Sequence, residues 1–132
     1  MQDARARYDE ISAAVVDAAM NLHRRWGPGL LESAYQQLLV HELGKRGFRL
    51  RTEVPVPLAW DGLVLDTAFR ADIIVDDLVL IELKAVEQNA PVHKRQVLTY
   101  LKLTNLRLGL LINFGVEHLR DGISRVANGM PT

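Results

Sequence analysis

Three charged side chains bound a mostly apolar stretch of the sequence, which reads DIIVDDLVLIELK over residues 72–84. Asp72 opens the stretch, and Glu82 and Lys84 end it. Because side chains alternate across a β-strand, Glu82 and Lys84 point to the same face. Two carboxylates on one face of a sheet can bind Mg²⁺, which prefers oxygen ligands, with Mn²⁺ as a substitute. A lysine beside them can orient a metal-activated water or balance the charge of a phosphoryl transition state.

The same three residues also fit a structural ion pair at the end of a strand. A buried ion pair often fails to recover the cost of removing its charges from water. A purely structural role therefore does not explain why Asp72, Glu82 and Lys84 occur together. The pattern favours a functional site.

Further polar side chains interrupt the apolar faces of two predicted helices. Glu32 lies on or beside the apolar stripe of its helix. In the first turn a carboxylate also stabilises the positive end of the helix dipole, with or without a metal. Tyr35 fits a core or supporting position better than a catalytic one. Gln96 and Tyr100 lie one turn apart on a later helix, where an ordinary half-exposed face explains them as well.

The composition argues against several other classes of site. The chain has no cysteine, which removes thiolate catalysis, disulfides and cysteine-based zinc sites. It has no glycine-flanked serine of the kind that acts as a hydrolase nucleophile, and no glycine-rich phosphate loop. The four histidines share no metal-ligand spacing and are interpreted as surface or core residues: His23, His41, His93 and His118.

The acidic residues can converge only if the hairpin that carries them has the right register. Two apolar runs of strand length flank a pair of aspartates, which is a turn pattern. A two-residue turn would pair Asp72 with Ile81 and so place it on the opposite face from Glu82. The site therefore predicts a three-residue loop over residues 76–78, or a bulge in one strand.

The other elements follow from the period of the apolar residues. Steps of three and four predict helices, alternation predicts strands, and Asp61-Gly62 predicts a hairpin turn. Pro55 and Pro57 place the first strand at an edge of the sheet, or end it there. The predicted elements are helices at 3–26, 30–45 and 92–103, strands at 48–56, 63–75 (one long bent strand or two short ones), 78–84 and 107–114, and a further strand or helical turn in the tail, 116–132.

The overall composition is that of an ordinary globular protein. The 132 residues, 48% hydrophobic and 24% charged, suit a single domain spanning 1–132. The 16 basic and 16 acidic side chains cancel, so a polyanion must be attracted by a local patch or a bound cation. No apolar run reaches membrane-spanning length and the first residues lack a signal-peptide pattern, so we expect a cytoplasmic protein without membrane contact.

Several segments together resemble one known family. They read GLLESAY, FRADIIV, VLIELKAV, QVLTYLK and LLINFG, and the resemblance covers nearly the whole chain. GLLESAY is similar to the pattern that names the GxxExxY proteins, which look like a branch of the PD-(D/E)XK nuclease superfamily. The resemblance implies an α/β fold with a restriction-endonuclease-like core, a mixed β-sheet flanked by helices in the order α-β-β-β-α-β. The first predicted helix would be an addition at the N-terminus of this core.

The resemblance also implies roles for the residues of the hairpin. Asp72 and Glu82 would bind Mg²⁺ together with the backbone carbonyl of Leu83. Lys84 would act with the attacking water. The residue before the aspartate is Ala71, whereas the family pattern has proline there.

The two helices would contribute supporting residues by the same resemblance. Glu32 corresponds to the acidic residue on the first core helix of many members, where it would support the metal or its waters. Gln96 and Tyr100 are similar to the Q-x-x-x-Y element of RecB-like nucleases, in which both side chains help to organise the site and the phosphate.

Two functions stay open at this point. The first is a Mg²⁺-dependent nuclease that hydrolyses phosphodiester bonds in DNA. The second is a catalytically inactive nuclease-like fold that serves as a binding or assembly module, as a homodimer or as a subunit of a DNA-processing complex. Small size and neutral charge favour the second, and the intact acidic and lysine residues favour the first.

Overall fold

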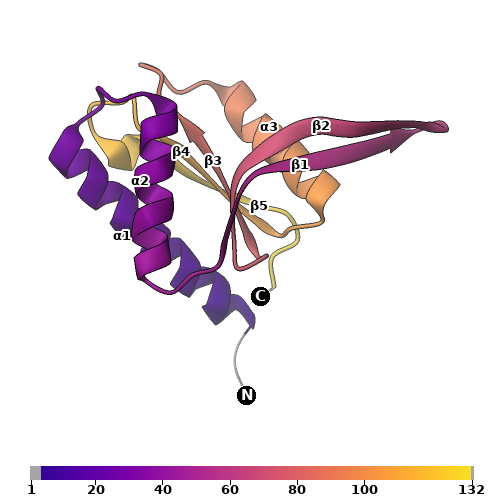
Figure 1. The fold of residues 1–132 in the computed structure, drawn as a ribbon, viewed down its shortest axis with the longest axis horizontal. Coiled ribbons are helices and arrows are strands. Elements are labelled where there is room, and N and C mark those ends of the chain that lie inside the picture. The colour runs from indigo at the N-terminus through magenta and orange to yellow at the C-terminus, as the bar shows by residue number, and fades with distance from the viewer. Residues whose placement is uncertain (1–3, 132) are drawn as a thin grey trace.

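The structure is a computed structural model that describes residues 4–131. Within these residues, three α-helices surround a five-stranded sheet (Figure 1). In chain order the elements are α1 (Ala4–Trp26), α2 (Glu32–Lys45), β1 (Leu50–Trp60), β2 (Leu63–Val75), β3 (Val79–Lys84), α3 (Pro91–Thr104), β4 (Leu108–Asn113), the 3-10 helix η1 (Leu119–Gly122) and β5 (Ile123–Ala127). The predicted helix start at residue 3 and the end of the predicted tail at residue 132 lie outside the described residues.

The strands lie side by side in the order β1-β2-β3-β4-β5. Every neighbouring pair is antiparallel except β3 and β4, which are parallel and are joined by α3 as the crossover such a pair requires. Helices α1 and α2 cover one face of the sheet, and α3 covers the other (Figure 1). The expected mixed sheet flanked by helices, in the order α-β-β-β-α-β after an extra N-terminal helix, is confirmed.

The helices form where the apolar period predicts them. In α1 the buried residues Ile11, Val15, Ala18 and Leu22 recur at steps of three and four and face the sheet. Helix α2 begins two residues later than predicted because Leu31 keeps an extended backbone as its N-cap. No helix within residues 4–131 has both the length and the apolar character needed to cross a membrane.

The hairpin between β2 and β3 has the register that the proposed chemistry needs. Ile73 pairs with Ile81 and Val75 with Val79, which leaves a three-residue loop over residues 76–78. The amide of Leu78 donates to the carbonyl of Val75 at 2.9 Å and closes the loop. The prediction of a three-residue loop is therefore confirmed.

Strands β1 and β2 continue past the body of the sheet as a two-stranded ribbon, residues 57–68, which we call the arm (Figure 1). The predicted Asp61-Gly62 turn is confirmed, with φ of 49° and 81° at its two residues, both positive as in a type I′ turn. Pro55 and Pro57 do not end β1, which runs through both. An edge strand tolerates proline because one of its sides has no partner strand.

A bulge marks the base of the arm. Val56 pairs with Phe69 and Leu58 with Leu65, so residues 66–68 of β2 lie opposite a single residue of β1. Such an insertion bends a strand and increases its twist. The arm is therefore directed away from the sheet that carries it.

Gly109 of β4 allows α3 to pack closely on the sheet. A Cβ atom at this position would lie 2.6 Å from Cγ1 of Val97 on α3. We expect Gly109→Ala to lower the free energy of unfolding by about 1–3 kcal/mol, the usual cost of overpacking a core. Denaturant unfolding measures this change.

Gly44→Ala is a matched control, because Gly44 is exposed in α2 and its added methyl would meet only Leu50, at 4.0 Å. Here the better helix propensity of alanine should stabilise the protein by up to about 1 kcal/mol. Equal stability of the Gly109→Ala variant and the wild type would show that α3 can move away from β4 at no cost.

Candidate active site

The site begins where β2 and β3 separate. Their backbone pairing ends at Ile73 and Ile81, one position before Asp72 and Glu82. Beyond this point the Asp72 side chain replaces the missing backbone contact, because its Oδ2 accepts a hydrogen bond of 2.8 Å from the Leu83 amide. The two carboxyl groups also interact directly with each other. The strand ends thus bring together the two acids that the sequence pattern singled out.

Glu82 is buried without adequate compensation for its charge. Its residue is 7% exposed, and its Oε1 has no hydrogen-bond partner. Burial, with the Asp72 carboxylate close by, raises the pKa of Glu82 to about 8. The contact with Asp72 raises the pKa of Glu82 but lowers that of Asp72, so Glu82 holds the proton at neutral pH.

Lys84 lies next to this pair of acids. Its Nζ is 4.0 Å from Oε2 of Glu82, at the limit of an ion pair, and its side chain is 24% exposed. Its positive charge lowers the pKa of both Asp72 and Glu82, although burial outweighs it at each. The Lys84 side chain is therefore partly open to solvent, where a substrate or water can approach it.

Asn113 fixes the strand end that carries Lys84, a role that the sequence analysis missed. It ends β4 opposite Lys84 and is 1% exposed. Its Oδ1 accepts hydrogen bonds of 3.0 Å from the amides of Val86 and Gly115. The chain that follows β3 is thus tied to the end of β4. The available signal was a polar residue that ends an otherwise apolar strand, LGLLIN.

One face of α3 borders the site. Burial, and then the charges of Glu82 and Asp72, raise the pKa of Tyr100, whose ring stacks on Phe69 with centroids 3.7 Å apart. Oε1 of Gln96, one turn away, is buried without a hydrogen-bond partner. The predicted pair from the Q-x-x-x-Y pattern therefore lies on the side of α3 that reaches the acids.

His93 lies one turn before Gln96 on α3, and it was not assigned to the site from the sequence. Burial, and then the charge of Lys84, lower the pKa of His93. It is therefore within electrostatic reach of the site, unlike His23, which is in the core and bonds to the Val116 carbonyl at 2.9 Å. The spacing of three residues between His93 and Gln96 is the sequence signal that could have identified His93.

Glu32 approaches the site from the other face of the sheet without joining the two acids directly. It is the first residue of α2 and is exposed. Burial of part of its carboxyl, and then the charge of Asp72, raise its pKa. Across residues 4–131, no three histidine or acidic side chains converge closely enough to coordinate one ion. A cation held by Asp72 and Glu82 therefore needs backbone or water oxygens as well.

Glu53 is a further acid that the sequence analysis did not single out. It lies in β1 between residues paired with Ile73 and Ala71, and so opposite Asp72. Its charge raises the pKa of both Asp72 and Glu32. Its φ of 49° is unusual for a residue other than glycine and cannot be predicted from an alternating strand pattern.

Tyr35 supports the site from a distance. Its ring stacks on Phe114 with centroids 4.2 Å apart. Its hydroxyl donates to the carbonyl of Gly27 and accepts from the amide of Leu30. Tyr35 therefore fixes the connection between α1 and α2, and with it the helix end at which Glu32 stands.

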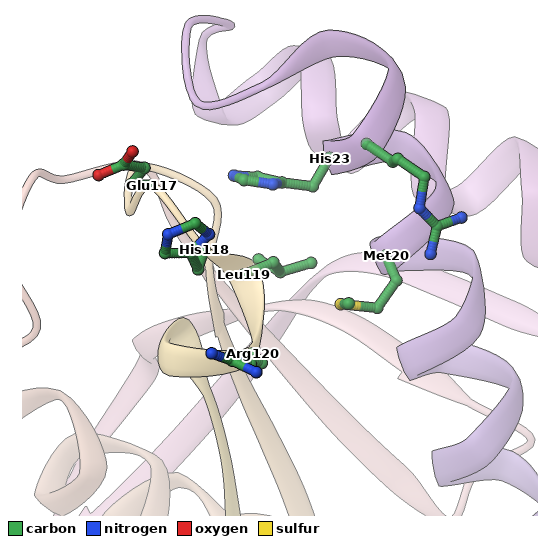
Figure 2. Close-up of a pocket in the computed structure, with 7 residues that line it drawn as sticks. Met20, His23, Glu117, His118, Leu119 and Arg120 are labelled. Atoms are coloured by element: carbon green, nitrogen blue, oxygen red, sulfur yellow. The ribbon is translucent and has the colours of Figure 1, made fainter.

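The pocket in Figure 2 is separate from these residues. It has a volume of about 380 Å³ and lies between the end of α1 and the loop after β4, with Met20 and His23 on one side and His118 and Arg120 on the other. None of the sequence-predicted site residues lines it. The candidate site is instead the pair of acids at the strand ends, the buried Glu82 and the half-buried Asp72.

Three comparisons relate this chain to known proteins. A family model described as the PD-(D/E)XK nuclease superfamily matches residues 9–126. A solved structure, described as "Crystal structure of SSO0001", is 23% identical to this chain, with a TM-score of 0.46 and coverage of 89% of this chain and 67% of that one. No curated protein is significantly similar in sequence.

Proposed function

The chain belongs to the PD-(D/E)XK nuclease superfamily, and from this premise we propose that it is a Mg²⁺-dependent nuclease that hydrolyses phosphodiester bonds in DNA. The observation that carries the proposal is the contact between two carboxyl groups, the buried Glu82 and the half-buried Asp72, with Lys84 beside them. The GxxExxY branch is our proposal for its place within the superfamily.

The donors at the strand ends fit a hard divalent cation. Asp72, Glu82 and the Leu83 carbonyl would hold Mg²⁺, or Mn²⁺ in its place, and Glu32 would reach its waters. The unpartnered Oε1 of Glu82 and the raised pKa of its carboxyl support this fit, because both are relieved when a cation binds the ionised pair. When bound, the cation would lower the pKa of a coordinated water and neutralise charge on the phosphate.

The side chains around these donors would position the reactants. Lys84 would orient the water that attacks phosphorus and would balance the negative charge that develops on the phosphoryl oxygens. Gln96 and Tyr100, on the face of α3 nearest the acids, would hold the phosphate or fix the carboxylates. Tyr35 would act only by fixing the start of α2.

Incubation with single-stranded, duplex and branched DNA tests the proposal. We expect cleavage of at least one substrate with Mg²⁺ or Mn²⁺. We expect a chelator to abolish it, because it removes the cation that would activate the water and neutralise charge on the phosphate. Matched RNA substrates test the choice of nucleic acid. Intact DNA in every reaction, at metal concentrations that saturate the site, would contradict the proposal.

A second candidate is a nuclease-fold module that binds or assembles without catalysis. The absence of a third acidic or histidine ligand near Asp72 and Glu82, within the described part of the chain, favours it. Titration calorimetry separates the two functions. Heat of binding with Mg²⁺ or Mn²⁺ at millimolar concentration supports the nuclease, and no binding supports the module.

A further inference from the structure

The pocket of Figure 2 lies at the same edge of the sheet as the candidate active site, although none of the proposed site residues lines it. It opens between the end of α1 and the loop after β4, and β4 ends beside β3 because these two strands are parallel. Its volume is about 380 Å³. Since a water molecule occupies about 30 Å³ in the liquid, the pocket has room for a phosphate group and several waters.

Basic side chains from both walls line this pocket. His23 and Arg24 belong to α1, and His118 and Arg120 belong to the segment after β4. His118 and Arg120 are exposed, and neither side chain has a hydrogen-bond or ion-pair partner among residues 4–131. Arg24 donates to the side-chain amide oxygen of Asn21 at 2.8 Å, and it has no acidic partner in the same described range. The pocket therefore has hydrogen-bond donors available for a ligand.

The charge of the lining is positive at neutral pH. Glu117 is the acid that lines the pocket with Arg24 and Arg120, so two guanidinium groups face one carboxylate when the histidines are neutral. In Figure 2 the carboxylate of Glu117 points away from His23 and His118. Such a lining attracts an anion. The arginines that pair with aspartates lie elsewhere in the fold: Arg5, Arg7, Arg46, Arg49, Arg51 and Arg125.

Core contacts hold the two walls of the pocket in place. Nε2 of His23 donates to the carbonyl of Val116 at 2.9 Å, which ties α1 to the loop after β4. Leu119 is 2% exposed and anchors the other wall in the core, against which Met20 also packs. Both Leu119 and Met20 add apolar surface to the lining. Apolar surface lowers the local dielectric constant and so strengthens the attraction between the basic groups and an anion.

Side-chain hydrogen bonds join the η1 wall of the pocket to the active site. Asn113 ends β4 opposite Lys84 and donates to Oδ1 of Asn89 at 3.0 Å. Asn89 in turn donates to the carbonyl of Asp121, in η1, at 2.8 Å. A Cβ atom at Gly122 would lie 2.4 Å from the carbonyl oxygen of Asn113, so η1 packs directly on the end of β4. The pocket and the acids of the site therefore keep a fixed separation.

We propose that this pocket binds a phosphate group of the DNA strand that is cleaved at the acids, an inference that rests on the proposed nuclease function. Neighbouring strands are about 4.8 Å apart and one residue spans at most about 3.6 Å, so Val116 at the pocket lies on the order of 15 Å from Lys84. A DNA strand advances about 3.4 Å per nucleotide along a duplex, which places the bound phosphate within about five nucleotides of the cleaved bond. The guanidinium groups of Arg24 and Arg120 would donate to its oxygens.

A titration with inorganic phosphate tests the pocket without DNA and without cleavage. We expect added phosphate to shift the NMR signals of the His118 imidazole and the Arg120 guanidinium, in the wild type and equally in Glu82→Gln, which lacks a proposed metal donor. Arg120→Ser should lose the response at His118. Arg107→Ser should keep it, because Arg107 is exposed at the other end of β4 and its removal changes the net charge equally. Signals that do not move in the wild type would overturn the proposal.

Anisotropy of labelled oligonucleotides in chelator tests the same pocket with DNA. Arg120→Ser should raise the dissociation constant about tenfold, because charged hydrogen bonds to a phosphate are lost, and should lower the salt slope by about one. Arg107→Ser should change the dissociation constant much less. Loss of affinity confined to strands with a 5′ or 3′ phosphate identifies a terminal phosphate as the ligand. Equal loss for every strand identifies an internal phosphodiester.

The two experiments separate failure of the pocket from failure of the nuclease. Circular dichroism shows that each variant is folded. If the wild type cleaves DNA while Arg120→Ser binds phosphate and every strand as Arg107→Ser does, the pocket is overturned and the nuclease stands. If phosphate shifts His118 in a wild type that leaves all DNA intact, the phosphate site stands and the nuclease is contradicted.

Discussion

Glu82→Gln is expected to abolish metal binding and DNA cleavage while making the metal-free protein more stable than the wild type at about pH 8. The wild-type carboxyl is buried, its Oε1 has no partner, and its pKa lies at about 8 instead of its ordinary 4.5. Glutamine keeps the shape of the side chain and removes the charge that a cation needs. The same change thus has opposite effects on activity and on stability.

The pH dependence of stability follows from the same shift. Below pH 4.5 both the folded and the unfolded chain hold the proton of Glu82. As the pH rises to about 8, the unfolded chain releases it and the folded chain keeps it, so the wild type loses stability by roughly 1 kcal/mol for each pH unit from this group. Glutamine does not titrate, and the advantage of the variant should grow with pH through that window.

Urea unfolding with a chelator, just above pH 4.5 and at about pH 8, measures this difference. Calorimetry with Mg²⁺ and a cleavage assay measure the other half of the prediction. Glu87→Gln is the matched control, because Glu87 is exposed. Cleavage by the Glu82→Gln variant at the wild-type rate would remove Glu82 from the site, and a metal-free variant less stable than the wild type would contradict the burial argument.

Lys84→Ala is expected to lower the rate of cleavage by a factor on the order of 10² to 10⁴, the range found when a positioned proton-transfer or charge-balancing group is removed. Lys84 is not one of the proposed metal donors, and its ammonium repels a cation at the neighbouring acids. Metal binding should therefore persist in this variant, in contrast to Glu82→Gln.

Single-turnover cleavage and calorimetry on the same preparation separate these two effects. Lys102→Ala is the control, because Lys102 is an exposed lysine in the last turn of α3 and is absent from the site. A Lys84→Ala variant that binds metal and cleaves at the wild-type rate would show that the lysine has no part in the reaction. Loss of metal binding would instead show that Lys84 mainly holds the acids in place.

The sequence could predict the parts of the fold and site that depend on local periodicity. The three-residue loop over 76–78 followed from the requirement that Asp72 and Glu82 share a face, and the Asp61-Gly62 turn followed from the residues that a type I′ turn needs. Gln96 and Tyr100 could be singled out because their spacing of four residues is one helical turn, and their role in the site stays a prediction.

The rest could not be predicted because it depends on how distant elements meet. An alternating strand pattern does not distinguish Glu53 from its neighbours, and only its left-handed backbone and its place opposite Asp72 make it part of the electrostatics. His93 gains its environment from Lys84 on another element. The length of the arm could not be predicted either. An apolar alternation in β2 does not show where β3 stops pairing with it.

Strand β2 carries both Leu65 of the arm and the Asp72 carboxylate on one length of backbone. Between them lies the bulge at residues 66–68, where the strand bends and its twist increases. The geometry of this bend sets the direction in which the strand enters the site. A substitution that removes the bulge would therefore turn the arm and the carboxylate relative to each other.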